Sequence, residues 1–362
     1  MPRLALGGHP PLVDVFTGGQ EGYAIYRIPA LLSTGGNTLL AFAEGRLTRH
    51  DHAENDIVAK RSADDGRTWG PLQVIHQAGS NALNNPTAVM LQNNRRVLLV
   101  YQHYAKGFDE HKAAPGFDGP RVCRTFIQHS DDQGATWSSP REITAQIKRP
   151  THVTSTAAGP GVGIQLARGK HQGRILIPFN QGPFGAWKVY AAISDDGGNS
   201  WRYGETASEG AAGFANEVQF AELKDGTVML NARNQGPGEK LRKIARSSDG
   251  GETWTTTTLD KTLIDPICQA SLIAVPGNGR DTTPILFFAN PASQHARTNG
   301  VLRWSRDEGK TWSDSRVIYP GSFAYSCLAW MGHGRVGCLF ERDGYSKISF
   351  TLTALEEMKE RP

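Results

Sequence analysis

Short apolar runs rich in β-branched and aromatic residues recur along the whole chain, and turns containing Gly, Pro, Asp or Ser separate them. The runs fall into six sets of three. The first set covers residues 26–32, 39–46 and 56–61, and the third set begins with the run 161–166. Runs of this length and composition, bounded by turn residues, predict β-strands. The best helix candidate is the short stretch 355–359, so the sequence predicts an almost purely β protein.

One motif, S-x-D-x-G-x-[ST]-W, follows five of the six sets, and we call it the box. The five boxes begin at Ser62, Ser130, Ser194, Ser247 and Ser305. In a tight turn the box aspartate can accept hydrogen bonds from backbone amides, the glycine can adopt a positive φ angle, and the tryptophan can bury a large apolar surface. Because turn chemistry explains every fixed position, we interpret the boxes as structural rather than catalytic.

The repeated sets predict the architecture. Each set supplies three strands, and the segment after each box leaves room for a fourth. Six such units predict an all-β, six-bladed β-propeller of four-stranded antiparallel blades, with residues 1–362 forming a single domain. A repeat solenoid is the alternative, but the β-meander pattern and the long repeat favour radial closure.

The order of the strands predicts which residues share a face. In an antiparallel meander the first strand starts and the second strand ends at one rim, whereas the third strand ends at the opposite rim, beside the boxes. Polar residues concentrate at the first of these rims. They are Arg27, Asn85, Glu217, Gln269 and Tyr325 at first-strand starts, Glu44, Arg46, Asn180, Arg233 and Glu341 at second-strand ends, and Asp51 and Arg297 in the following loops.

This polar set predicts an anion-binding active site. An arginine guanidinium forms two parallel hydrogen bonds with a carboxylate, so several arginines on one axis can fix such a group firmly. Glu44 and Glu341 would balance part of the positive charge. Tyr325, with an unperturbed pKa of about 10, is a poor nucleophile alone, but an adjacent carboxylate such as Glu217 can act as its base.

The overall composition narrows the class of partner. Lysine and arginine number 39 and acidic residues 35, and the resulting net charge of +4 argues against a nucleic-acid-binding protein. No apolar run reaches the length of a membrane span. The first sixteen residues show no signal peptide. We therefore expect a cytoplasmic location for the chain as written, and a secreted or periplasmic one if a leader precedes it.

Neither a metal nor an organic cofactor is implied by the sequence. The cysteines contain no C-x-x-C pair, and we expect buried thiols at Cys123, Cys268, Cys327 and Cys338. His50 and His52 flank Asp51 and could suggest a metal site, but their loop setting and the lack of a second cluster argue against it.

Longer motifs make the chain resemble the sialidase (neuraminidase) family over about residues 16–353. They are Y-R-I-P at 26–29, A-F-A-E-G-R at 41–46, the five boxes, N-A-R-N at 231–234 and A-Y-S at 324–326. The boxes alone are weakly specific, whereas their combination with Y-R-I-P and the N-A-R-N arginine is highly specific. The resemblance implies a single catalytic sialidase domain, an exo-α-sialidase that removes terminal sialic acid from sialylated glycans.

The resemblance also implies a role for each polar residue. Asp51 would be the general acid, Tyr325 the nucleophile and Glu217 its base. Sialidases depart from the two-carboxylate scheme of glycosidases through their tyrosine nucleophile. The substrate-binding residues would be Arg27, Arg233 and Arg297 around the carboxylate, Arg46 near that group and the sugar O4, Glu341 orienting Arg27, and Asn85 beside the N-acetyl or glycerol group.

Two assignments stay open in the sequence. Glu54 or Asp56 could replace Asp51 if the loop has another register, and Arg303 competes with Arg297, which we prefer because it falls in a loop. Three other functions also fit parts of the pattern. They are a trans-sialidase, a sialidase that prefers a deaminated sialic acid, and a non-catalytic propeller with boxes that binds a protein.

The sequence carries three further expectations about the surroundings of the site. The polar, Gly- and Pro-rich segment 105–120 is expected to form a mobile rim loop, with a gating role for substrate conceivable. Phe184 and Trp187 are expected to shape the aglycone side. Glu222, close to Glu217, is expected to be a solvated strand residue.

Overall fold

A computed structural model of the chain describes residues 11–92, 95–210, 212–277 and 282–354. Within these residues nearly all regular structure is β-strand, and the helical elements are the short α1 (Thr144–Ile147) and the 3-10 turn η1 (Gly169–His171). The all-β prediction is therefore confirmed. The helix candidate at 355–359 and residues 1–10 of the segment inspected for a leader lie outside the described residues.

The strands succeed one another with short connections. In chain order they are β1 (Val13–Thr17), β2 (Ile25–Gly35), β3 (Thr38–Arg46), β4 (Asn55–Ser62), β5 (Gln73–His76), β6 (Ala82–Met90), β7 (Val97–Tyr104), β8 (Arg124–Ser130), β9 (Arg141–Glu142), β10 (Thr156–Ala158), β11 (Gly161–Val162), β12 (Ile164–Gln165), β13 (Ile175–Gln181), β14 (Lys188–Ser194), β15 (Arg202–Tyr203), β16 (Phe214–Glu222), β17 (Val228–Gln235), β18 (Leu241–Ser247), β19 (Thr258–Ile264), β20 (Ser271–Val275), β21 (Ile285–Pro291), β22 (Thr298–Ser305), β23 (Asp314–Trp330), β24 (Arg335–Arg342) and β25 (Lys347–Ala354).

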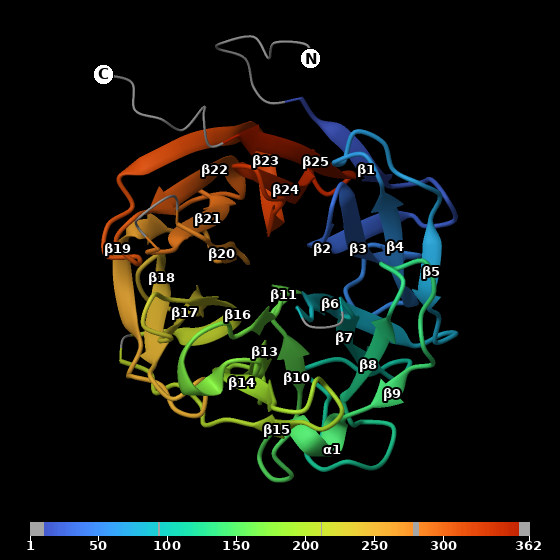
Figure 1. Cartoon of the computed structure of the whole chain (residues 1–362). Helices are drawn as coiled ribbons and strands as arrows, with labels where there is room; N and C mark the ends of the chain where they lie inside the picture. The colour runs from blue at the N-terminus through green and yellow to red at the C-terminus, as the bar shows by residue number, and fades with distance from the viewer. Residues whose placement is uncertain (1–10, 93–94, 211, 278–281, 355–362) are drawn as a thin grey trace.

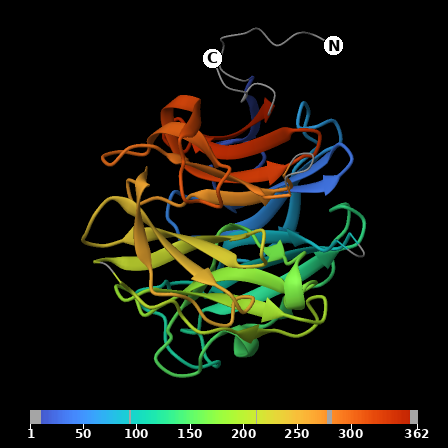
Figure 2. The same ribbon diagram turned by 60° about the vertical axis from the view of Figure 1, so that its left-hand side comes forward.

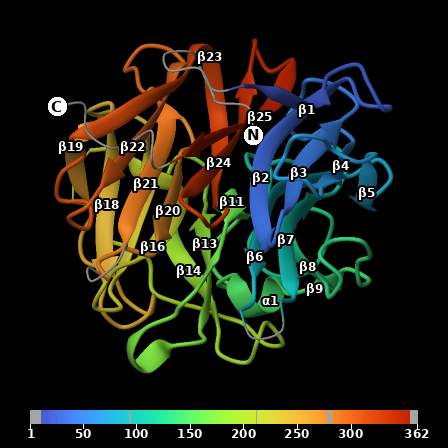
Figure 3. The same cartoon turned by 45° about the horizontal axis from the view of Figure 1, so that its top comes forward.

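Antiparallel meanders dominate the pairing. The meanders are β2–β3–β4–β5, β6–β7–β8–β9, β10–β13–β14–β15, β16–β17–β18–β19, β20–β21–β22–β23 and β23–β24–β25–β1. The long strand β23 belongs to two of them, because its first part pairs with β22 and its last part with β24. The sheets stand in a ring with their inner strands around a central axis, as Figure 1 shows from one face and Figures 2 and 3 from two other directions. This arrangement is consistent with a β-propeller.

The two ends of the chain close the ring. Strand β1 pairs with β25, with Val13 opposite Phe350 and Thr17 opposite Lys347. Asp14 of β1 contacts Arg342 at 2.5 Å and Lys347 at 2.7 Å. Partial burial acts to raise the pKa of the Asp14 carboxyl, but hydrogen bonds from Lys347, Ser349 and Arg342 outweigh it and lower the pKa to about 2. The closure thus combines backbone pairing with an ionised carboxylate.

The boxes form the tight turns that the sequence predicts. In the second box, Asp132 accepts hydrogen bonds from the backbone N–H (2.8 Å) and the hydroxyl (2.6 Å) of Thr136, and Ser130 Oγ accepts the N–H of Gly134 at 2.8 Å. The other four boxes repeat this pattern. Gly134 has a φ of +82°, and a Cβ there would approach the Leu40 side chain to 2.6 Å, so the position requires glycine.

The register separates the boxes from the polar rim. Ser62 of the first box lies opposite Leu39 at the start of β3, whereas Ile25 at the start of β2 lies opposite Arg46 at the end of β3. In the second meander, Ser130 likewise lies opposite Val97 at the start of β7. The boxes and the polar set therefore lie at opposite ends of the strands, as predicted.

One predicted strand is wrong in its course. The sequence favoured a continuous first strand over 161–166, but β10 pairs with β13, β11 pairs in parallel with β6, and β12 returns to β13. Pro160 has no N–H for a ladder, and Gly163 lies so close to Ile177 that no side chain fits there. These residues divide the inner strand into three short pieces.

The four cysteines are buried free thiols, as predicted. No helix among the described residues has the length and apolar character needed to cross a membrane.

We expect Asp132→Ala to lower the free energy of unfolding by about 1–2 kcal/mol, because the box loses three hydrogen bonds to the carboxylate. The matched control is Asp131→Ala, which removes exposed contacts with Arg96 and His129 and should change stability by less than about 1 kcal/mol. Urea unfolding of both variants measures the difference. Equal losses would contradict a structural role specific to the box aspartate.

Candidate active site

A polar pocket opens at the rim where the inner strands begin. Eight of the nine site residues predicted from the sequence line it, namely Arg27, Arg46, Asp51, Asn85, Glu217, Arg233, Arg297 and Tyr325. The ninth, Glu341, is fully buried and contacts Arg27 from behind. Side chains from residues almost 300 positions apart in the chain thus converge on one cavity.

Irregularities in four inner strands direct these side chains into the pocket. The antiparallel register shifts between Arg27 and Ala30 in β2, and at the corresponding point in three other strands. Those three shifts lie between Asn84 and Thr87, Ala215 and Val218, and Phe323 and Ser326. Extra residues in a strand change the direction of its side chains, and here they include Ile28, Asn85, Glu217 and Tyr325.

Two buried glutamates stabilise these irregular segments. Ile28 and Asn85 adopt left-handed φ angles of 58° and 56°, and for a β-branched residue such as Ile28 this conformation is strained. The N–H of Ile28 donates to Glu341 at 2.8 Å, and the N–H of Asn85 donates to Glu44 at 2.7 Å. The carboxylates therefore compensate the strain with charge-assisted hydrogen bonds.

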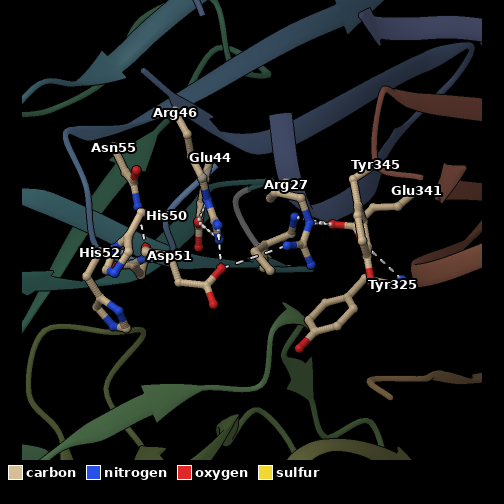
Figure 4. A network of polar contacts seen from close by, with 12 residues as sticks. Arg27, Glu44, Arg46, His50, Asp51, His52, Asn55, Tyr325, Glu341 and Tyr345 are labelled. Atoms are coloured by element: carbon tan, nitrogen blue, oxygen red, sulfur yellow. Dashed lines mark hydrogen bonds and ion pairs between the residues drawn. The ribbon is translucent and has the colours of Figure 1, made fainter. Parts of the chain in front are cut away.

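Arg27 is the first of three arginines around Tyr325. Its Nε donates to Glu341 at 2.6 Å, and its guanidinium lies 4.2 Å from the ring centre of Tyr345 (Figure 4). Burial acts to lower the pKa of Arg27, but Glu341, Tyr325 and Asp51 outweigh burial and raise the pKa above its ordinary value. Arg27 is consequently a fixed cation.

Arg233 and Arg297 complete the group around Tyr325. Arg233 Nη1 donates to Glu217 at 2.7 Å and to the Tyr325 hydroxyl at 3.2 Å. Arg297 donates to the Tyr345 hydroxyl at 3.2 Å and to the Ile267 carbonyl at 3.1 Å. Its guanidinium and that of Arg27 each lie 5.4 Å from the centre of the Tyr325 ring. Three partly buried cations thus surround one phenol.

The phenol of Tyr325 is paired with a carboxylate. Its hydroxyl donates a short hydrogen bond to Glu217 Oε1, while Glu217 Oε2 accepts from Arg233. Burial and the negative charge of Glu217 raise the pKa of Tyr325 well above its usual value, although Arg233 and Arg297 act in the opposite direction. Tyr325 is therefore a neutral phenol with a proton acceptor already in contact.

Asp51 lies at the mouth of the pocket on the side of Arg46 (Figure 4). Its carboxylate contacts Arg46 at 2.5 Å and Arg27 at 3.8 Å, and 68% of its side chain is exposed. Burial tends to raise the pKa of Asp51, but Arg46 and Arg27 lower it below its ordinary value. The loop is anchored because the Asp51 carbonyl accepts hydrogen bonds from Asn55 (2.6 Å) and Asn84 (2.9 Å).

The geometry decides between the candidates that the sequence left open. Asp56 is buried and accepts a hydrogen bond from Tyr23 at 2.7 Å, and Glu54 contacts Lys106 at 4.0 Å, so neither lines the pocket. Arg303 lies within β22 and is also absent from the lining. Among these candidates, Asp51 and Arg297 are the residues that line the cavity.

Two other expectations are wrong or need correction. Glu222 is not solvated, because only 7% of its surface is exposed and it accepts the N–H groups of Ala167 (2.9 Å) and Arg168 (3.0 Å). The turn between β12 and β13 leaves these amides without strand partners, so a carboxylate there is required. Gln269 does not line the pocket; it is buried on the axis, with hydrogen bonds to both backbone groups of Ser326 at 2.9 Å.

The rim loop expected at 105–120 is packed against the pocket. Glu110 lines the cavity, and burial raises the pKa of its carboxyl. The ring of His111 lies 3.7 Å from that of Phe184, which in turn lies 4.8 Å from Trp187. Glu110 could not be singled out from the sequence, because a lone acid in a polar loop has no pattern.

A buried ion pair that the sequence did not suggest supports Arg297. Arg242 and Asp265 are almost completely enclosed, at 0% and 1% side-chain exposure, and lie 3.0 Å apart. Asp265 accepts the N–H of Cys268 at 3.0 Å, and Arg242 donates to the Cys268 carbonyl at 2.7 Å. These contacts fix the turn whose strained residue, Ile267 with φ 63°, accepts from Arg297.

The histidines of the Asp51 loop contact one another and an aromatic side chain. The N–H of His52 donates to His50 Nδ1 at 3.1 Å, and the His52 ring packs edge-on against Tyr104. Burial lowers the pKa of His52 to about 4, so its ring is neutral at physiological pH. Among the described residues, no group of three or more His, Cys, Asp or Glu side chains could hold a metal ion.

Comparison with known proteins identifies the family. A family model described as "BNR repeat-like domain" matches residues 37–338. The chain is 36% identical over 350 residues to a sialidase of Micromonospora viridifaciens, with 92% of this chain and 53% of that protein covered. It is 30% identical over 376 residues to Sialidase-2 of Cricetulus griseus, with coverages of 96% and 97%.

Solved structures agree with the sequence matches. The structure of "Hadza microbial sialidase Hz136" superposes with a TM-score of 0.86 at 28% identity, covering 96% of this chain and 69% of that one. The chain thus spans about half the length of the Micromonospora relative and nearly all of the Cricetulus one. The sheets and the repeat match define a β-sheet protein with BNR-type repeats. The chain belongs to the sialidase family.

We expect Glu341→Gln to lower the free energy of unfolding by about 3 kcal/mol or more, because Glu341 is fully buried and is the nearest counter-charge of Arg27. The control, Asp343→Asn, neutralises a partly exposed acid whose partner Arg342 keeps a second carboxylate, Asp14, and should cost less than about 1 kcal/mol. Denaturant unfolding compares the two. A Glu341→Gln protein as stable as the control would contradict this assignment.

Proposed function

We propose that this chain is an exo-α-sialidase that hydrolyses terminal sialic acid from sialylated glycans with retention of anomeric configuration. The observation that carries the proposal is the hydrogen bond between Tyr325 and Glu217 within a cluster of three arginines. A glycosidase acting on a sugar whose anomeric carbon bears a carboxylate needs cations for that group. It also needs a nucleophile without charge, since an anionic one would be repelled.

In the proposed complex the sialic acid carboxylate binds Arg27, Arg233 and Arg297. Their guanidinium groups are held by Glu341, Glu217 and Tyr345, so little side-chain entropy is lost when substrate binds. The carboxylate supplies the negative charge that buried cations require. Arg46 extends the positive surface toward Asp51 and the ring hydroxyls. Asn85, whose side chain donates to the Ala158 carbonyl at 3.2 Å, contributes to the wall beside the sugar.

The proposed first step forms a covalent intermediate. The Tyr325 oxygen bonds to C2 as its proton passes to Glu217, and the C2–oxygen bond to the aglycone breaks as Asp51 protonates the leaving oxygen. In the second step, Asp51 takes a proton from water, whose oxygen bonds to C2 while the bond to Tyr325 breaks and Glu217 returns the proton. Two inversions at C2 give net retention.

Asp51 must be protonated before it can act as an acid, and in the empty pocket Arg46 and Arg27 hold its pKa low. A substrate carboxylate bound to Arg27 would reduce the positive potential that Arg27 exerts on Asp51. The aglycone would also cover the exposed side chain of Asp51. Both changes raise the pKa of a carboxyl group. We infer that substrate binding itself converts Asp51 into a competent general acid.

We also infer the finer architecture. Six antiparallel meanders, closed by β1 against β25, support a six-bladed propeller with four strands in most blades, and the pocket on its axis supports a single catalytic domain over residues 1–362. The convergence of Tyr325, Glu217 and three arginines favours an enzyme over a non-catalytic binding module, since binding a protein requires no paired phenol and carboxylate.

Replacing the proposed nucleophile tests the mechanism. Tyr325→Phe should reduce kcat on a fluorogenic α-sialoside by more than about a thousandfold, because the hydroxyl that bonds to C2 is lost. Tyr319→Phe removes a surface hydroxyl bound to Asp343 and should leave kcat unchanged. Retention of most activity by Tyr325→Phe would exclude this nucleophile, and transfer of sialic acid to added lactose would indicate a trans-sialidase instead.

Replacing the proposed acid should affect substrates unequally. An aryl leaving group departs without a proton, whereas the sugar of sialyllactose needs one. Asp51→Asn should therefore lower kcat/KM on sialyllactose at least about a hundredfold more than on the aryl sialoside. Measuring both substrates with the same enzyme preparation controls for folding. An equal loss on both would mean that Asp51 acts in binding rather than in proton transfer.

A further inference from the structure

One wall of the pocket is built from two amide side chains. Asn84 of β6 and Gln102 of β7 are direct partners in the antiparallel ladder, so their side chains lie on the same face of the sheet, with Cβ atoms about 5 Å apart. Both residues line the pocket, although only 7% of the surface of Asn84 and 1% of that of Gln102 is exposed.

These amides hold unused hydrogen-bonding capacity. Asn84 uses its Nδ2 to anchor the Asp51 carbonyl, but its Oδ1 has no partner among the described residues. Within the described chain, neither the Oε1 nor the Nε2 atom of Gln102 has a hydrogen-bond partner. Two acceptors and one amino donor group are thus buried and unsatisfied at one point of the cavity wall. By contrast, the neighbouring Asn85 donates to the Ala158 carbonyl.

Unpaired amide atoms of this kind destabilise the protein unless a polar group forms hydrogen bonds with them. A buried donor or acceptor left unsatisfied destabilises a protein by about 1–3 kcal/mol. A ligand group that packs against these atoms must therefore form hydrogen bonds with them or lose affinity. An apolar group against Gln102 would leave three polar positions unpaired, whereas a hydroxyl both donates and accepts.

The wall lies on the side of the pocket away from Arg297. In Figure 1, β6 and β7 lie across the central axis from β21 and β22, whose connecting loop carries Arg297. A sialic acid with its carboxylate on the arginines and C2 at Tyr325 would direct the opposite side of its ring toward Asn84 and Gln102. Sialic acids differ there mainly in the substituent at C5, which is an acetamido, a hydroxyacetamido or a hydroxyl group.

We propose that Gln102, together with Asn84, forms a subsite that selects sialic acids presenting a hydroxyl group at C5. This inference rests on the proposed sialidase function and adds the substrate class. The hydroxyl donates to Gln102 Oε1 or Asn84 Oδ1 and accepts from Gln102 Nε2. The terminal methyl of an N-acetyl group offers no such partner. The hydroxyl can come from an N-glycolyl group or from a deaminated sialic acid, and the experiment separates these sources.

The test compares kcat/KM for the 4-methylumbelliferyl α-glycosides of N-acetyl-, N-glycolyl- and deaminated neuraminic acid. The wild-type enzyme should favour at least one hydroxylated substrate over the N-acetyl one by about tenfold or more, since a site built for a hydroxyl discriminates against its absence. The preferred glycoside shows whether the selected hydroxyl belongs to an N-glycolyl group or to a deaminated sialic acid. Gln102→Met should reduce that preference at least tenfold, while Gln73→Leu, a change at a partly exposed position on β5 outside the pocket, should preserve it.

Stability provides a second readout. Because Gln102→Met replaces an unsatisfied amide with an apolar chain of similar length, the variant should unfold at the same temperature as the wild type or higher. A merely structural glutamine would instead leave a less stable protein.

Three outcomes would each overturn a different assignment. If the wild type hydrolyses none of the three glycosides, the sialidase function itself is wrong. If it hydrolyses them but favours the N-acetyl compound, or shows no preference, the subsite is wrong and the function stands. If a hydroxyl preference survives Gln102→Met in a folded variant, the selectivity belongs to other residues and the role of Gln102 is refuted.

Discussion

The carboxylate of Glu341 is the contact on which the site most depends. It lies on β24, accepts Arg27 Nε and the strained N–H of Ile28 from β2, and accepts the N–H of Tyr325 from β23 at 3.2 Å. Burying a carboxylate costs several kcal/mol unless its lone pairs are used, and here three donors use them. One anion thereby joins the first and last inner strands of the ring and positions both a carboxylate-binding arginine and the proposed nucleophile. The contacts of Glu341 that join these two strands therefore also assemble the site.

A second consequence concerns charge. Of the three arginines around Tyr325, Arg27 contacts Glu341 and, at 3.8 Å, Asp51, while Arg233 contacts Glu217. Among the described residues Arg297 has no carboxylate partner, and its acceptors are the neutral Tyr345 hydroxyl and the Ile267 carbonyl. An anionic ligand would therefore supply the counter-charge that Arg297 lacks. Because Glu217 is shared between Arg233 and Tyr325, a ligand carboxylate that engages Arg233 would also free Glu217 to accept the phenolic proton. Binding and activation are coupled through that one side chain.

The sequence predicted most of the architecture because its signals are local. Apolar runs of strand length and the box turns located the strands, and the direction of a meander then placed Arg27, Arg233 and Tyr325 on one rim. The irregular inner strands could not be predicted, since the register shift near Asn85 depends on Glu44, 41 positions away. For a similar reason, the break of the inner strand at Pro160 and Gly163 could not be predicted. Gln102, Glu110 and Tyr345 escaped notice because only tertiary structure shows what such residues face, or which of their atoms lack partners.

The two sides of the pocket obey different physical rules. On the arginine side every guanidinium is held by protein acceptors before substrate arrives, so recognition of the carboxylate is strong but common to all sialic acids. On the other side, Asn84 Oδ1 and both amide atoms of Gln102 are unpartnered within the described chain, so their free energy depends on which ligand substituent faces them. Affinity and selectivity are thus separable: the first resides in arginines that protein acceptors hold in place before binding, and the second in hydrogen bonds that only a suitable ligand completes. A change at Gln102 can alter which sugar is chosen without disturbing how its carboxylate is held.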